Sequence, residues 1–102
     1  MTEADIMRSI MLACRSSTVR LFRNNVGKLP DRLGRWVTYG LGVGSADLIG
    51  INGGRFVAIE VKLPGQKATQ EQQDFINMVR SMGGQAGVAH NVEEAIEILA
   101  KP

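Results

Sequence analysis

A predicted β-hairpin in the middle of the chain constrains the fold most. Residues 46–51 and 55–62 have the apolar, β-branched character of two strands, and Asn52-Gly53-Gly54 between them is a strong turn signal. If Gly53-Gly54 forms the loop, Asp47 lies directly across from Glu60; if Asn52-Gly53 forms it, the two acids are diagonal neighbours. Both registers place the carboxylates on one face, about 5 to 8 Å apart.

A pair of carboxylates in this position calls for a compensating cation. Like charges so close on a sheet are destabilising, and divalent cations favour oxygen ligands. Lys62 projects from the same face as Glu60, because side chains alternate along a strand. Two carboxylates and an amine on one patch are the outline of a metal-dependent hydrolytic site; the alternative is an exposed hairpin pair without a role.

Length and composition indicate one small domain over residues 1–102. The sequence is 44% hydrophobic and 22% charged, which is ordinary for a globular protein. No run reaches the roughly 18 apolar residues of a membrane span, and the acidic start with Glu3 and Asp5 is unlike a signal peptide, so we expect an intracellular protein. The single Cys14 excludes an intramolecular disulfide and predicts a buried apolar side chain; the single His90 excludes a histidine pair.

Positive charge is concentrated in one part of a chain whose net charge is only +2. Between residues 15 and 35 there are six arginines and lysines against one acid, Asp31. A basic stretch beside a carboxylate site suits a polyanionic substrate held through its phosphates, although it also fits a solvated, arginine-rich loop. The candidates for phosphate contacts are Arg20, Arg23, Lys28, Arg32, Arg35 and Lys67.

The first half of the chain predicts a helix, a strand and an irregular region. A helix is expected from Thr2, its N-cap, to about residue 15, with Ile6, Ile10 and Cys14 on its inner face. Alternation predicts a half-buried strand from residue 18 to about 24. Residues 26–33 have the composition of a loop, residues 36–39 that of a short strand, and residues 40–44 that of a flexible glycine-rich segment.

After the hairpin, two helices flank a short strand. Thr69 caps the first helix with Gln72 at the capping-box position, and Gly83-Gly84 ends it. Residues 85–90 form the strand, and Asn91 caps the last helix with Glu94 at the matching position. The inner faces are predicted to carry Phe75, Ile76, Val79 and Met82 in the first helix, and Val92, Ala95, Ile96 and Leu99 in the second. The order α-β-(β)-β-β-α-β-α, with a right-handed crossover after the hairpin, gives an α/β fold with a mixed sheet flanked by helices.

This order and these motifs resemble the PD-(D/E)XK (restriction-endonuclease-like) superfamily, whose site pairs an acid at the start of one strand with Glu-x-Lys on the next. The resemblance covers nearly the whole chain and is narrower for the VRR-NUC branch, in its small free-standing form. It rests on Gly44 to Gly50, Ala58-Ile59-Glu60-Val61-Lys62, Thr69-Gln70-Glu71-Gln72 and Gly83 to Ala89. Two departures stand out: Ala46 replaces the proline of the superfamily name, and Val88-Ala89-His90 replaces Val-Arg-Arg.

The resemblance implies catalytic roles for Asp47, Glu60, Lys62, Gln72 and Glu3. Asp47, Glu60 and the backbone carbonyl of Val61 would hold Mg²⁺ or Mn²⁺, and Lys62 would position the attacking water or offset charge on the phosphoryl group. An acid of the first helix reaches the metal in relatives, which makes Glu3 a further candidate ligand; its other interpretation is an acid favoured by the helix dipole. Gln72 matches a glutamine beside the site, and it also serves the capping box.

The resulting interpretation is a metal-dependent, structure-specific DNA endonuclease. With no room for an appended DNA-reading domain, recognition of DNA shape is expected instead of recognition of sequence. Compact relatives resemble dimeric Holliday-junction resolvases, often of phages, which implies a homodimer on branched DNA in the cytoplasm of a bacterium or a phage-infected cell. Two alternatives remain open: a non-catalytic DNA-binding module, and a nuclease acting on flaps, nicks or single strands.

Overall fold

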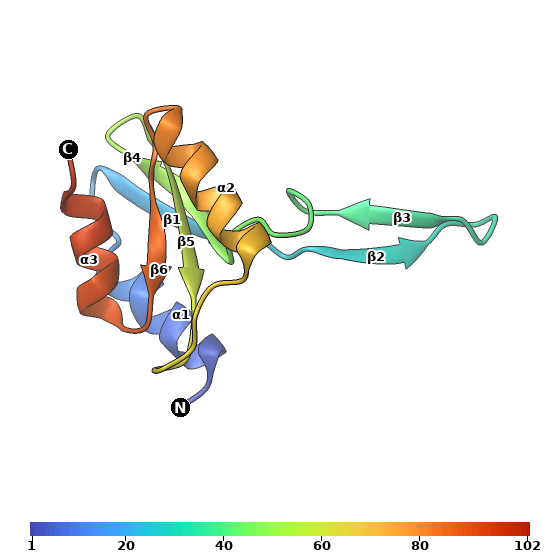
Figure 1. Ribbon diagram of the computed structural model, residues 1–102, viewed down its shortest axis with the longest axis horizontal. Helices are drawn as coiled ribbons and strands as arrows, with labels where there is room; N and C mark the ends of the chain where they lie inside the picture. The colour runs from blue at the N-terminus through green and yellow to red at the C-terminus, as the bar shows by residue number, and fades with distance from the viewer.

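A four-stranded mixed sheet in the order β1-β4-β5-β6 forms the centre of the computed structural model, which describes residues 1–102 (Figure 1). Its strands are β1 (Val19–Arg23), β4 (Leu48–Asn52), β5 (Arg55–Val61) and β6 (Gln85–Ala89). β4 pairs antiparallel with β1 and β5, and β6 pairs parallel with β5. The strand-helix-strand connection after the hairpin therefore joins parallel strands, as predicted.

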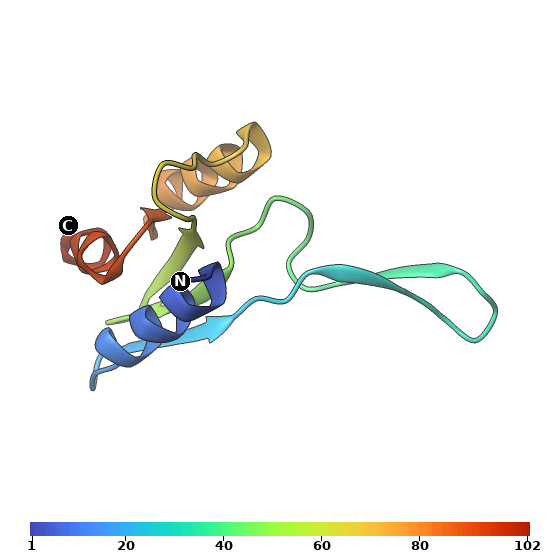
Figure 2. The ribbon, with the colours of Figure 1, turned by 90° about the horizontal axis from the view of Figure 1, so that it is seen from below.

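Three helices cover the two faces of this sheet (Figures 1 and 2). α1 (Glu3–Ala13) and α3 (Val92–Ala100) cover one face over the larger apolar cluster, which includes Val57, Ile59 and Val61 of β5. α2 (Gln70–Ser81) covers the other face over a smaller cluster with Ala58. Because side chains alternate along β5, Glu60 shares the α2 face with Ala58. None of the helices is long and apolar enough to cross a membrane.

The central hairpin adopts the first of the two predicted registers. Asn52 pairs with Arg55 and Leu48 with Ile59, so Gly53-Gly54 is the two-residue loop. Both glycines have positive φ, 55° and 89°, the requirement of a type I′ turn, whose twist matches that of the strands. Asp47 directly precedes β4 and, in this register, lies across from Glu60.

The predicted loop over residues 26–33 is wrong. Gly27–Pro30 forms strand β2, which pairs with β3 (Trp36–Tyr39) as a separate two-stranded sheet. Figures 1 and 2 show it projecting from the body as an arm. Its tip is held by Asp31, whose Oδ1 accepts hydrogen bonds from the backbone N–H groups of Leu33 and Arg35, both at 2.9 Å. The observed order is α-β-β-β-β-β-α-β-α, one strand more than predicted.

The predicted inner faces are right for α1 and partly wrong for the other helices. Ile6, Ile10 and Cys14 are buried, as expected. Met82 is 78% exposed, because it lies at the C-cap of α2, past the last residue that packs on the sheet. Ile96 is 51% exposed and Ile98 is buried in its place, so α3 presents Ala95 and Ile98 to the core.

The capping boxes differ between the helices. Thr69 and Gln72 form both hydrogen bonds of the box at α2. At α3, Asn91 Oδ1 accepts from the N–H of Glu94 at 2.8 Å, but the carboxylate of Glu94 turns to the N–H of His90 and leaves the box incomplete. The second box predicted from sequence is therefore only half formed.

Candidate active site

Asp47 lies half-buried where the chain enters β4. Its Oδ2 accepts a hydrogen bond from the N–H of Val61 at 2.9 Å, which ties the acid to the end of β5. Its backbone carbonyl accepts from the N–H of Asn24 at 2.8 Å. The second carboxylate oxygen, Oδ1, accepts no hydrogen bond from the protein and is available to a ligand.

Glu60 is the buried acid of the pair, with only 3% of the residue exposed. Its Oε1 accepts from Gln72 Nε2 at 2.8 Å and faces Lys62 Nζ at 4.0 Å, whereas Oε2 is buried without any hydrogen-bond partner. Burial, followed by the negative charge of Asp47, raises the pKa of Glu60 to about 8. A buried carboxylate with one unpaired oxygen beside a second acid would be stabilised by a bound cation.

Gln72 serves the helix cap and the carboxylate pair at once. Its Oε1 accepts from the N–H of Thr69 at 2.8 Å, and the Thr69 hydroxyl accepts from the N–H of Gln72 at 3.2 Å. This leaves the side-chain NH₂ group of Gln72 to donate to Glu60. The two interpretations of Gln72 from sequence are thus compatible, because each uses a different end of the amide.

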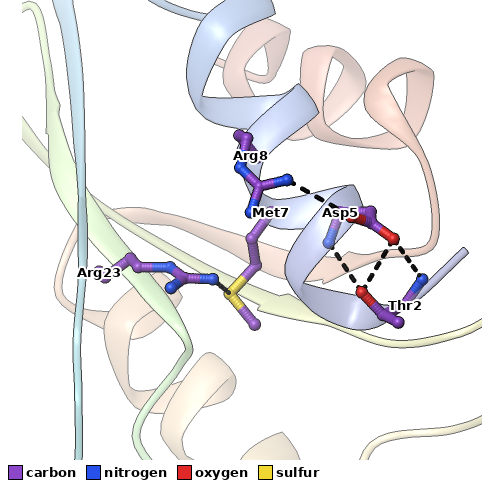
Figure 3. A network of polar contacts seen from close by, with 5 residues as sticks. All are labelled: Thr2, Asp5, Met7, Arg8 and Arg23. Atoms are coloured by element: carbon purple, nitrogen blue, oxygen red, sulfur yellow. Dashed lines mark hydrogen bonds and ion pairs between the residues drawn. The ribbon is translucent and has the colours of Figure 1, made fainter.

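Glu3 is not gathered with the other acids. It lies half-buried in the first turn of α1, and α1 packs on the face of the sheet opposite α2. The chain forms no group of three or more histidine, cysteine, aspartate or glutamate side chains placed to hold a metal ion. The capping box at Thr2 uses Asp5, whose Oδ2 accepts from the Thr2 N–H at 2.8 Å (Figure 3), so Glu3 has no capping role.

The six candidate phosphate ligands fall into three places. Arg20 and Arg23 lie on β1, where Arg20 Nη1 donates to the carbonyl of Ser16 at 2.9 Å and Arg23 reaches back to the sulfur of Met7 on α1 at 3.8 Å (Figure 3). Lys67 lies in the turn before α2. The other three are carried by the arm: Lys28, Arg32 and Arg35.

Asn24 was missed by sequence reasoning and joins the arm to the site. Its Nδ2 donates to Ser45 Oγ and to the carbonyl of Ala46, both at 2.8 Å, and its Oδ1 accepts from the N–H of Leu41 at 3.2 Å. These bonds close the base of the arm immediately before Asp47. The available signal was an Asn-Asn pair at a strand end, which is typical of a turn.

His90 occupies the last position of the Val88-Ala89-His90 segment and bridges two acceptors. Its Nδ1 lies 2.7 Å from Glu94 Oε1, and its Nε2 lies 2.7 Å from the carbonyl oxygen of Gln66. Both neighbouring oxygens act as acceptors, so the imidazolium is the form of the ring that satisfies both contacts. The Gln66 carbonyl, followed by Glu94, raises the pKa of His90 accordingly. The two contacts therefore favour a positively charged ring at this position.

Comparison with known protein families identifies a match over most of the chain. Residues 5–93 match the VRR-NUC domain, which is most of the chain's length. The chain belongs to the VRR-NUC family. No curated protein matches the sequence. Family membership and the mixed sheet with its three helices agree with the PD-(D/E)XK-like fold predicted from sequence.

VRR-NUC membership implies a nuclease, a hydrolase whose substrate is DNA. In this VRR-NUC chain, Asp47 and Glu60 stand side by side at adjacent strands, with Lys62 and Gln72 facing Glu60 Oε1. Such an arrangement can hold a cation between the free carboxylate oxygens and present an amine to an anionic substrate.

Proposed function

We propose that this VRR-NUC protein is a divalent-metal-dependent endonuclease that cleaves branched DNA, such as a four-way junction, as a homodimer. The observation that carries the proposal is the unpartnered, buried Oε2 of Glu60 beside Asp47. A buried polar atom without a partner is costly, and here the cost falls on a charge-bearing group next to a second acid. A bound cation removes that cost.

The donor set suits a hard cation. Asp47, Glu60 and the backbone carbonyl of Val61 would hold Mg²⁺ or Mn²⁺, with water completing the coordination. When bound, such a cation supplies Lewis-acid activation of the phosphodiester. All the protein ligands are oxygens, which matches the preference of these ions over softer ones.

The chain's own side chains would prepare the reaction. Gln72 holds Oε1 of Glu60 by a 2.8 Å hydrogen bond, while Oε2 has no partner within the protein. Lys62 is 16% exposed at its side chain, and its amine lies 4.0 Å from Oε1 of the buried Glu60. From there it can orient the attacking water or offset negative charge on the phosphoryl group in the transition state.

The distribution of cations supports recognition of shape. The six candidate phosphate ligands lie on β1, on the arm and before α2, which are separate parts of the surface. Contacts to backbone phosphates position a protein on DNA but carry no sequence information. A homodimer would set one such site against each of two strands of a branched substrate, which is the reason for preferring a junction over linear DNA.

The test is a cleavage assay on labelled four-way junction, flap, nicked, linear duplex and single-stranded DNA, with Mg²⁺, Mn²⁺ or EDTA. The variants are Asp47→Ala and, as a matched control, Glu97→Gln, which removes an exposed acid on α3. We expect symmetric incision of the junction that requires metal, is abolished by Asp47→Ala and is retained by Glu97→Gln.

Other outcomes would change the assignment. Metal-dependent cleavage confined to flaps, nicks or single strands would keep the nuclease and discard the junction. Binding without cleavage under every metal would favour a DNA-binding module, and cleavage that survives Asp47→Ala would remove the carboxylate pair from the chemistry.

A further inference from the structure

The arm, defined as residues 26–39, has one face that is apolar along β2 and β3, with the Asp31–Arg35 ion pair at its tip. The β2–β3 register pairs Leu29 with Val37 and Gly27 with Tyr39, so these side chains share a face. Leu29 is 61% exposed, Val37 is 50% exposed and Tyr39 is 44% exposed. The opposite face carries Lys28 and Trp36, so the arm's only strand cation lies away from the apolar face.

No other element of the chain covers this face. Figures 1 and 2 show the arm extending clear of the body in both views. The radius of gyration, 14.1 Å, exceeds the roughly 13 Å expected of a compact domain of about 100 residues. Within the arm, the Tyr39 ring lies over Gly27 so closely that a side chain at residue 27 would collide with it. An isolated two-stranded hairpin is marginally stable in water, so the arm needs a surface to pack against.

The body offers an uncovered apolar surface of its own. A hollow of about 350 Å³ lies between α2 and β5 and is lined mainly by Leu41, Phe56, Phe75, Met78 and Met82. None of its lining side chains is charged. We call this hollow the α2 groove. The groove begins at Leu41, just past the base of the arm. The arm points away from the body and does not cover the α2 groove of the same chain.

We infer that the apolar face of the arm packs into the α2 groove of a second copy, and that the two copies exchange arms reciprocally. The inference rests on the proposed homodimer and identifies its interface. A two-fold axis turns one arm–groove contact into two identical ones, which is the isologous arrangement of most homodimers. Each copy would contribute the four residues of its apolar arm face and the seven residues that line its groove, so the contact is small beside a standard interface of about 20 to 30 residues a side.

The chemistry of the two surfaces favours a protein partner over DNA. The strand residues of the apolar face, Leu29, Val37 and Tyr39, offer no cation to phosphates, whereas an uncharged groove lined with methionine and phenylalanine buries them well. Lys28 lies on the opposite face and Arg32 lies in the turn at the tip, so both stay available for DNA in the exchanged dimer, whereas Arg35 is paired with Asp31 at 2.8 Å. Exchange would also fix each arm base, and with it the segment that leads to Asp47, through contacts made by the partner.

The test uses a pair of charge-bearing variants, one in each surface. Val37→Lys alters the arm and Met82→Glu alters the groove; both positions are exposed, so the fold of the body is preserved. Ile96→Glu, which adds a charge at an exposed site on α3, is the matched control. Molar mass is measured by light scattering after size exclusion over a dilution series, and folding is checked by circular dichroism.

We expect the wild type and Ile96→Glu to be dimers, and Val37→Lys and Met82→Glu each to dissociate at least about tenfold more readily. Mixing the two variants should restore a dimer, because the lysine arm meets the glutamate groove while the other contact is wild-type. A monomeric wild type, or a Val37→Lys protein that dimerises as the wild type does, would overturn the inference. Loss of DNA binding without loss of the dimer would overturn it as well and assign the arm to DNA.

A cross-link provides a second measurement that does not depend on weakening the interface. In a Cys14→Ala background, one tagged copy carries Leu29→Cys and the other Met82→Cys, and a short bismaleimide is added. The expected product joins the two tags. Linkage within a single chain bearing both cysteines at high dilution would contradict arm exchange. Metal-dependent cleavage by the wild type is scored separately, so failure of the exchange and failure of the nuclease assignment are distinguishable.

Discussion

Glu60 and Leu29 occupy positions opposite to those their side chains prefer. The carboxylate of Glu60 belongs to a residue that is 3% exposed in the body, and the apolar Leu29 is 61% exposed on the arm. Each deviation is uncompensated within the chain: Oε2 of Glu60 has no partner, and the arm packs on no other element. Unfavourable placements of this kind, a buried charge or an exposed apolar side chain, occur at functional surfaces, because binding of a ligand removes their cost.

The buried carboxylate of Glu60 and the exposed apolar face of the arm require different ligands. A buried negative charge is relieved by a cation, and the relief is electrostatic, local and dependent on pH. An exposed apolar face is relieved by another apolar surface, and the relief grows with area and is insensitive to pH. Separate perturbation of the two regions should therefore give separate responses.

The largest expected difference lies in cleavage by Glu60→Gln compared with Val37→Lys. Removing the charge of Glu60 should lower the rate by at least about 10³-fold, because a cation could no longer be held opposite Asp47. Isothermal titration with Mn²⁺ should show no saturable binding to Glu60→Gln and wild-type affinity for Val37→Lys, since the arm leaves the carboxylate pair intact. Equal loss of Mn²⁺ affinity in both variants would show that the regions are not independent.

The second prediction concerns stability and pH in EDTA. The pKa of Glu60 in the folded state is raised to about 8, so the folded protein holds this proton more tightly than the unfolded chain does. The free energy of unfolding should consequently fall as pH rises from about 4.5 to about 8, by on the order of 2 to 4 kcal/mol. Glu60→Gln should be more stable than the wild type at pH 8 and should lack this part of the slope.

Urea unfolding of both proteins from pH 5 to 8.5 provides the measurement. Identical slopes in the two proteins would mean that Glu60 ionises without a burial penalty. Added Mg²⁺ should reverse the order at pH 8 by stabilising only the wild type, because Glu60→Gln lacks a ligand.

Sequence patterns located the carboxylate site because its determinants are local. The glycine pair sets the register, the register sets Asp47 against Glu60, and the spacing from Thr69 to Gln72 sets the cap that turns the amide toward Glu60. These are turn and periodicity rules that act within a few residues, and the family resemblance pointed to the same positions. The placement of Glu3 on the other face was not available from such rules.

Strand β2 of the arm was predicted as a loop for a physical reason. β2 contains Gly27 and Pro30, both poor strand formers, and its strand state comes from pairing with β3 and from the Asp31 turn. The rotation of α3, which buries Ile98 and exposes Ile96, is likewise set by packing on α1 and the sheet. Asn24 was missed because its partners lie some 20 residues along the chain.

The third prediction tests the junction between the two regions. Asn24→Ala removes three side-chain hydrogen bonds at the base of the arm and leaves polar groups without partners, at a cost of about 1 to 3 kcal/mol. Because the same segment leads into Asp47, cleavage should also fall. Asn25→Ala is the control, since Asn25 is exposed and its side chain makes no hydrogen bond. Urea unfolding and the junction assay should separate the two variants; matching behaviour would mean that Asn24 does not couple the arm to the site.

The smallest expected effect comes from His90, which lies in the body far from the arm. The contacts that raise the pKa of His90 also stabilise the folded state. This stabilisation is complete at pH values below the ordinary histidine pKa of about 6.5, and it is lost as the pH rises through the pKa of His90 in the folded state. In a Glu60→Gln background, which removes the titration of Glu60, His90→Gln should lower Tm by about 2 to 4 °C at pH 5.5 and by less at pH 9. His90→Arg keeps the charge at all these pH values, so its Tm should not show the loss at alkaline pH.

Thermal melts of the three proteins from pH 5.5 to 9 measure this directly. A difference between His90→Gln and the parent that is constant with pH would show that the bridge from Glu94 to Gln66 needs hydrogen bonds but no charge. A difference that fades with pH, together with a flat profile for His90→Arg, would show that the imidazolium of His90 takes the place of the second arginine of the Val-Arg-Arg pattern. Neither outcome should change the molar mass, because His90 touches neither the arm nor the α2 groove.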